Sequence, residues 1–193
     1  MLILSLIFVV ALLGIQIMKR PFLEKNLRKL FWIPVAAVFF LSAVFSVIQY
    51  NAWKNSDVYK IALEQTDGGM GGFFYNAFMS YFAPHLMSLA LAGFLALMMF
   101  WLNKRSGGNF FEKEEILVAF LAGFLSGFPG FLFFMFGIVI AYLLAHLEKA
   151  ARKKSVKSGV IPLYYFWLPV SASVILVSMV WLSKLEFWRL LTV

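Results

Sequence analysis

The sequence predicts an all-α fold, a polytopic membrane helix bundle with about six membrane segments, and two observations lead to this class. First, 63% of the 193 residues are hydrophobic and only 13% are charged, which leaves too little polar surface for a water-soluble domain. Second, long uncharged apolar runs recur between short basic or polar loops, and about 20 such residues cross a bilayer as a helix. We therefore expect a single membrane domain over residues 1–193, surrounded by the lipid bilayer.

Composition also excludes several classes of function. The net charge of +8 does not indicate a nucleic-acid partner, because the lysines and arginines gather beside apolar runs, where they orient a membrane protein and meet anionic lipid. The chain has no cysteine, which excludes disulfides, thiolate metal sites and cysteine nucleophiles. It also lacks a phosphate-binding loop, a Gly-x-Ser-x-Gly elbow and a His-Glu-x-x-His helix. We expect no cofactor and no bound metal.

Five apolar stretches account for the membrane segments. In chain order they cover residues 1–18, 31–50, 85–102, 116–147 and 161–182. The first is expected to be a retained span, because it has neither a basic start nor a small-residue cleavage site. A further aromatic stretch at 73–82 is about half a bilayer long and is separated from the third stretch by Pro84. It predicts an interfacial or re-entrant segment.

The fourth stretch contains no charged residue and is interrupted only by Gly127-Phe128-Pro129-Gly130. As one straight helix it would be about 48 Å long, against about 30 Å of hydrocarbon in a bilayer. It therefore predicts a hairpin of two short membrane helices over residues 115–147, which reverses direction at the Gly-Phe-Pro-Gly turn.

The distribution of lysine and arginine supports the same hairpin. If the N-terminus is outside, the inner side holds 13 of the 17 lysines and arginines, in residues 19–29, 104–113 and 149–157. A single crossing at 116–147 would move the last group outside and remove this asymmetry. The positive-inside rule therefore favours the hairpin independently of its length.

Two positions beside the apolar runs carry side chains that suggest chemistry. Glu115 follows Glu112 and Glu114 at the start of the hairpin, where a helix dipole stabilises carboxylates. These acids are either solvated capping residues or, for Glu115 at the edge of the apolar run, a carboxyl with a raised pKa suited to acid/base catalysis. Gln49, near the end of the second stretch, is either a partner in a helix–helix hydrogen bond or part of a catalytic site.

From residue 90 to residue 182 the order of these features resembles the type IV prepilin peptidases, membrane aspartic proteases that include the archaeal preflagellin peptidases. The shared series is a glycine pair, acids at a short helix, a Gly-aromatic-Pro-Gly turn, a second apolar helix, a basic loop and an Ile-Pro start to the last segment. In this chain it reads Gly107-Gly108, Glu114-Glu115, Gly127-Phe128-Pro129-Gly130 and Ile161-Pro162. Upstream, Val47-Ile48-Gln49 followed by Asp57 resembles the family's Val-Ile-Asp segment.

The resemblance implies a pair of catalytic acids, and it places Glu115 at the second position of the pair. Gln49 stands at the first position, and because an amide cannot titrate, Asp57 would have to replace it. The family's catalytic aspartates are thus not retained. The resemblance predicts a divergent, inactive or altered prepilin-peptidase-like protein of a prokaryotic inner membrane, a pseudoenzyme of type IV pilus biogenesis that handles the membrane helix of a pilin-like substrate.

An alternative hypothesis needs no catalysis. In it the hairpin packs against partner helices of a larger membrane complex, and the protein is a non-catalytic subunit. Both hypotheses predict a multi-pass protein of the cell membrane. They differ in whether Glu115 meets a second carboxylate in a site that water can reach.

Overall fold

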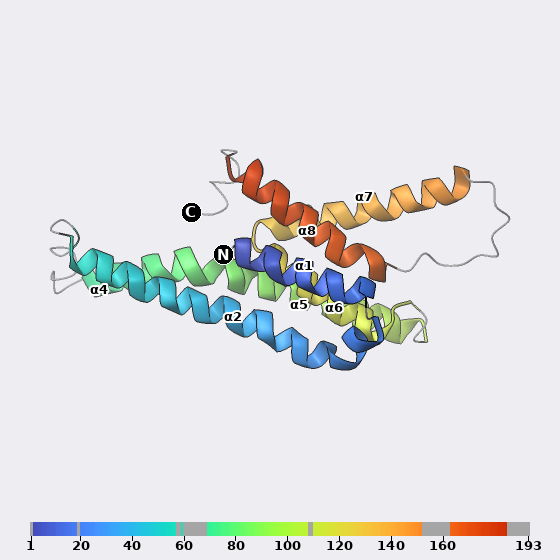
Figure 1. The fold of residues 1–193 in the computed structure, drawn as a ribbon, viewed down its shortest axis with the longest axis horizontal. Helices are drawn as coiled ribbons and strands as arrows, with labels where there is room; N and C mark the ends of the chain where they lie inside the picture. The colour runs from blue at the N-terminus through green and yellow to red at the C-terminus, as the bar shows by residue number, and fades with distance from the viewer. Residues whose placement is uncertain are drawn as a thin grey trace.

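The computed structural model describes residues 2–18, 20–56, 59, 69–107, 110–151 and 163–184. Within these residues the secondary structure is entirely helical, which confirms the all-α prediction (Figure 1). In chain order the elements are α1 (Leu2–Met18), α2 (Arg20–Lys54), α4 (Gly69–Ala77), η1 (Phe78–Phe82), α5 (Ala83–Arg105), α6 (Lys113–Ser126), α7 (Gly130–Ala151), α8 (Tyr164–Val180) and η2 (Leu182–Lys184). η1 is a π-helical turn and η2 is a 3₁₀ turn.

Three of the helical runs are long and apolar enough to cross a membrane. They are Lys25–Lys54 in α2, Met70–Arg105 across α4, η1 and α5, and Gly130–Glu148 in α7. α1 and α8 are apolar but contain 17 residues each, which reach about 25 Å at 1.5 Å per residue. α6 contains 14 residues. Six helices thus occupy the predicted segments, and three of these segments have the length of a full crossing.

The aromatic stretch at 73–82 is not a separate segment, which corrects the prediction of an interfacial or re-entrant element. It continues into α5, so that Met70–Arg105 is one run of 36 residues. In η1 a backbone N–H bonds the carbonyl five residues earlier, and Pro84 follows in the first turn of α5, where its missing N–H is tolerated. The Ser42 hydroxyl of α2 lies 2.9 Å from the Tyr81 carbonyl oxygen and ties the π turn to α2.

The stretch 116–147 folds as α6 and α7, which reverse direction at residues 127–129 as its length predicted. Gly127 has a φ of 67°, which side-chain-bearing residues rarely adopt, and it ends α6. The second arm is longer than predicted, because α7 has 22 residues and continues through Glu148 to Ala151. Glutamate, lysine and alanine are good helix formers, so the helix does not stop where the apolar run stops.

Figure 1 shows which helix ends lie together. The junction of α1 with α2, the end of α5 with the start of α6, and the end of α7 with the start of α8 all lie on the right of the view. We call this the cationic end, since α5 ends there with Lys104 and Arg105 and α6 begins there with Lys113. On the left, α2 and α4 extend beyond α1, α6 and α8 as a pair, which we call the two-helix extension.

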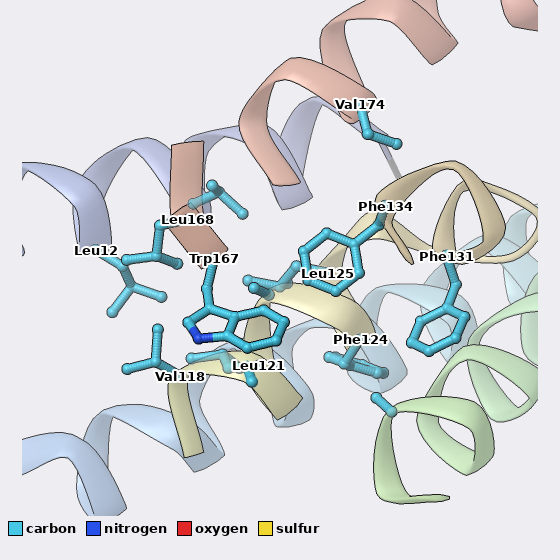
Figure 2. Packing of buried hydrophobic residues seen from close by; sticks show 14 of the residues in the cluster. Leu12, Val118, Leu121, Phe124, Leu125, Phe131, Phe134, Trp167, Leu168 and Val174 are labelled. Atoms are coloured by element: carbon cyan, nitrogen blue, oxygen red, sulfur yellow. The ribbon is translucent and has the colours of Figure 1, made fainter. Parts of the chain in front are cut away.

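α6 lies at the centre of the bundle. It contacts α1, α2, α5, α7 and α8, and its residues 118–126 are buried except for Phe120. Figure 2 shows Phe124 and Leu125 of α6 in the buried apolar cluster with residues of α7 and α8. The Trp167 ring centroid of α8 lies 6.0 Å from that of Phe134 in α7. The first hairpin arm is therefore enclosed by protein on most of its surface.

Buried serines tie three helices together around the end of α6. Ser88 of α5 donates to the Phe124 carbonyl at 2.7 Å. Ser171 of α8 donates to the Ala122 carbonyl at 2.9 Å and lies 3.0 Å from the Ser126 hydroxyl. The last carbonyls of a helix lack partners within the helix, and an apolar interior supplies no water for them. Ser88 also lies 3.3 Å from the carbonyl oxygen of Gly123, one of the last four residues of α6, and supplies a donor there.

Gly137→Ala should destabilise the protein, because a Cβ there would lie 2.7 Å from Val170 Cγ1 across the contact between α7 and α8. Overpacking of this kind costs about 1–3 kcal/mol, so the midpoint of thermal unfolding in detergent should fall. Gly14→Ala is the matched control, since no atom of a neighbouring residue lies within 4 Å of the place that its new methyl group would take. It should be neutral or slightly stabilising, because alanine favours helices. Equal losses in both variants would contradict a close approach at Gly137.

Candidate functional site

Glu115 is the one acidic side chain that is buried among the described residues. It lies in the first turn of α6, outside the three candidate spans, and 5% of its surface is exposed. Two donors reach its carboxylate. One is the Trp167 Nε1–H of α8, 3.2 Å from Oε1, and the other is the backbone N–H of Glu112. Glu112 is the N-cap of α6, so the second bond is one half of a capping box.

Glu115 thus lies at a capping position as predicted, but the predicted solvated environment is wrong for this residue, which is 5% exposed. Its carboxylate bonds the start of its own helix and a side chain of α8. A buried charge is tolerated when hydrogen bonds replace the lost water. Glu115 thus fixes where α6 begins and how α6 packs against α8. These contacts explain its burial without a catalytic role.

Two further buried polar residues lie at the same level as Glu115. Near the cationic end, apolar side chains of α1, α6 and α8 pack together in one layer. Its members include Leu12, Val118 and Leu168, which Figure 2 shows side by side. About one helix turn closer to the cationic end stand Gln16, Glu115 and Tyr164, which are 3%, 5% and 1% exposed. We call these three residues with Trp167 the Glu115 cluster.

The Glu115 cluster joins three helices by hydrogen bonds. Gln16 of α1 donates from Nε2 to the backbone carbonyl of Tyr164 in α8 at 3.0 Å, and Trp167 of α8 donates to Glu115 of α6. The Oε1 atom of Gln16 is buried and has no hydrogen-bond partner in the described structure. Sequence reasoning missed Gln16, although the signal that drew attention to Gln49, an amide within an apolar run, is present at Gln16 as well.

Burial raises the pKa of Glu115 above its ordinary value of 4.5, because an ionised carboxylate loses its water there. The Trp167 and Glu112 hydrogen bonds lower the pKa in part, and the Glu112 charge raises it. The folded chain therefore binds this proton more tightly than the unfolded chain. The resulting contribution to stability is present below pH 4.5 and is lost as the pH rises through the raised pKa.

Gln49 lies far from Glu115, on the two-helix extension. Its Nε2 donates to Asn76 Oδ1 of α4 at 3.1 Å, which confirms the helix–helix hydrogen bond as its structural role. The rings of Phe31 in α2 and Phe120 in α6 are 5.0 Å apart between centroids and fix the register of these helices. Gln49 lies 18 residues beyond Phe31, about 27 Å along α2, whereas Glu115 lies on the other side of Phe120.

The structure thus does not bring the two positions of the implied catalytic pair together. Asp57, the predicted substitute for Gln49, lies outside the described residues. Glu114 is half-buried and Glu112 is exposed in the same turn as Glu115, so neither is a second buried acid. The catalytic assignment of Glu115, Gln49 and Asp57 stays a prediction.

Two apolar grooves lie away from the Glu115 cluster. One, of about 580 Å³, lies between α2 and the α4–η1 run of the two-helix extension, with Val47, Phe74 and Phe78 among its lining residues. The other, of about 600 Å³, lies between α7 and α8, with Phe136 and Trp181 in its lining. In the described part of the chain no three histidine, aspartate or glutamate side chains gather as metal ligands would.

Comparisons with protein-family models, with curated proteins and with solved structures each give no match to this chain.

Replacing Glu115 with glutamine should change the pH dependence of stability. Glutamine keeps the shape of the side chain and removes its titration, so the variant should lose less stability than the wild type as the pH rises above 4.5. Thermal unfolding of both proteins in detergent between about pH 4 and pH 8 measures this difference. Glu114→Gln, which removes a charge from the same turn, is the matched control. An equal pH dependence in both variants would contradict the assignment to Glu115.

Proposed function

We propose that the protein is a multi-pass protein of the cell membrane that binds the apolar membrane helix of a pilin-like protein without cleaving it. The apolar parts of the six helices α1, α2, α5, α6, α7 and α8 are its membrane segments, and α6 and α7 form a hairpin that opens on the cytoplasmic side. The cations gathered at the cationic end support this orientation.

The observation that carries the proposal is the use that the fold makes of Glu115 and Gln49. The resemblance to prepilin peptidases implies an acid at each position. Glu115 is engaged by Trp167 and the Glu112 N–H, and Gln49 is engaged by Asn76 at the other end of the bundle. Both residues therefore hold helices together, and neither meets a second carboxyl group among the described residues.

Cleavage of a peptide bond by an aspartic protease needs two carboxyl groups that share a proton, one to activate water and one to protonate the leaving group. Glu115 alone supplies one. Removing a titrating member of a catalytic unit lowers the rate by about 10⁴- to 10⁶-fold. Binding, in contrast, requires only apolar surface and shape, which the grooves offer to an apolar helix.

A second candidate function is supported by the position of these grooves. They lie on the two-helix extension and between α7 and α8, both apart from Glu115. Two separate apolar grooves are expected in a non-catalytic subunit that packs against partner helices of a larger membrane complex.

Co-expression with a pilin-type precursor that carries an affinity tag tests the proposal. We expect the precursor to copurify with the protein at its full length, because binding remains while the acid pair is lost. Glu115→Gln and Glu114→Gln should both give full-length precursor.

Three results separate the hypotheses. Shortening of the precursor by the wild type that is lost in Glu115→Gln and kept in Glu114→Gln would overturn the proposal and establish a peptidase. Absence of both shortening and copurification would reject pilin-helix binding and favour the subunit function. If the full-length precursor copurifies with the wild type, loss of copurification on a polar substitution at Val47 or at Phe136 would show which of the two grooves binds the helix.

A further inference from the structure

The end of α5 presents an aromatic ring and two cations on one exposed face. Trp101, Lys104 and Arg105 stand three and four residues apart, so they project from the same side of the helix. The Arg105 guanidinium carbon lies 5.3 Å from the centroid of the Trp101 ring, a cation–π geometry that holds the guanidinium in place. The three side chains line a surface hollow of about 480 Å³.

Both cations of this hollow remain available for a ligand. Lys104 and Arg105 are exposed, and neither forms an ion pair with a carboxylate in the described part of the chain. Phe110 and Phe111, after the loop, are bonded to Asn103 of α5, whose side-chain oxygen accepts both of their backbone N–H groups. The hollow therefore carries two positive charges that no carboxylate of the described residues pairs with.

An apolar strip on the same helix continues from the hollow towards the middle of the bundle. Phe94, Leu97 and Met98 precede Trp101 at helical spacing and are 63%, 68% and 46% exposed. They belong to the candidate span Met70–Arg105, so in a bilayer this strip faces the hydrocarbon. A tryptophan between an apolar strip and a pair of cations marks the depth of the lipid headgroups.

We propose that Trp101, Lys104 and Arg105 bind the phosphate of an anionic phospholipid whose acyl chains lie along Phe94, Leu97 and Met98. A planar guanidinium bonds a phosphate through two parallel N–H groups, and a lysine adds a point charge. The apolar strip favours a membrane lipid over a free phosphate, because a soluble anion has no acyl chain to pack against it. This site is independent of the proposed function in pilin-helix binding.

Native mass spectrometry of the purified full chain with phosphatidylglycerol and phosphatidylcholine tests this site. The wild type should prefer the anionic lipid, and Lys104→Gln with Arg105→Gln should reduce that preference by about thirtyfold, since each cation contributes about 1 kcal/mol near an anionic surface. Lys54→Gln with Lys184→Gln is the charge-matched control, because both of these lysines are exposed at the ends of other helices. The control should keep the preference.

Two further arms test the contact made by Arg105 and the source of the phosphate. Arg105→Lys keeps the charge but loses the two-point bond and the stacking on Trp101, so it should reduce the preference several-fold without loss of folding. Glycerol phosphate, the soluble headgroup, should bind far more weakly than the lipid. Equal loss in the control pair, or glycerol phosphate binding as tightly as the lipid, would overturn the proposal.

Discussion

The reversal of the chain between α6 and α7 is the constraint on which the rest of the structure depends. Breaking a helix inside an apolar bundle leaves backbone carbonyls that no water can reach. Here Ser88 of α5 donates to the Phe124 carbonyl, which also accepts the Gly127 N–H, and lies 3.3 Å from the Gly123 carbonyl oxygen. Ser171 of α8 donates to the Ala122 carbonyl one residue before the last four of α6. These bonds tie α5 and α8 to the end of α6.

The same reversal sets the environment of Glu115. A helix that ends inside the bundle and is enclosed by five others also begins close to them, so its first-turn carboxylate is buried. Trp167 and the Glu112 N–H then satisfy it, and the pKa of Glu115 rises because it has lost its water. A raised pKa in a membrane protein is often interpreted as catalytic, but here burial by the packed helices accounts for it.

Much of the architecture could be predicted from the sequence. The break at Gly127-Phe128-Pro129 followed from a run too long for one crossing, and the helix–helix bond of Gln49 followed from an amide in an apolar run. The continuity of Met70–Arg105 could not be predicted, because Pro84 suggests the start of a separate helix. In the structure the chain stays helical up to Pro84 through the π turn η1, which is bonded to Ser42 of α2. The partners of Glu115 in the Glu115 cluster were missed, because the members of the cluster are adjacent only after α1, α6 and α8 have packed.

The central claim is that α6 and α7 form a hairpin whose two outer ends face the same side of the membrane. The chain has no cysteine, so single substitutions Lys113→Cys, Glu148→Cys, Lys54→Cys and Lys184→Cys can be labelled in membrane vesicles of known orientation with a membrane-impermeant maleimide. The hairpin predicts labelling of Lys113→Cys and Glu148→Cys from one side, which is the cytoplasmic side in the proposed orientation, and of the other two from the opposite side. Labelling of Lys113→Cys and Glu148→Cys from opposite sides would contradict the hairpin.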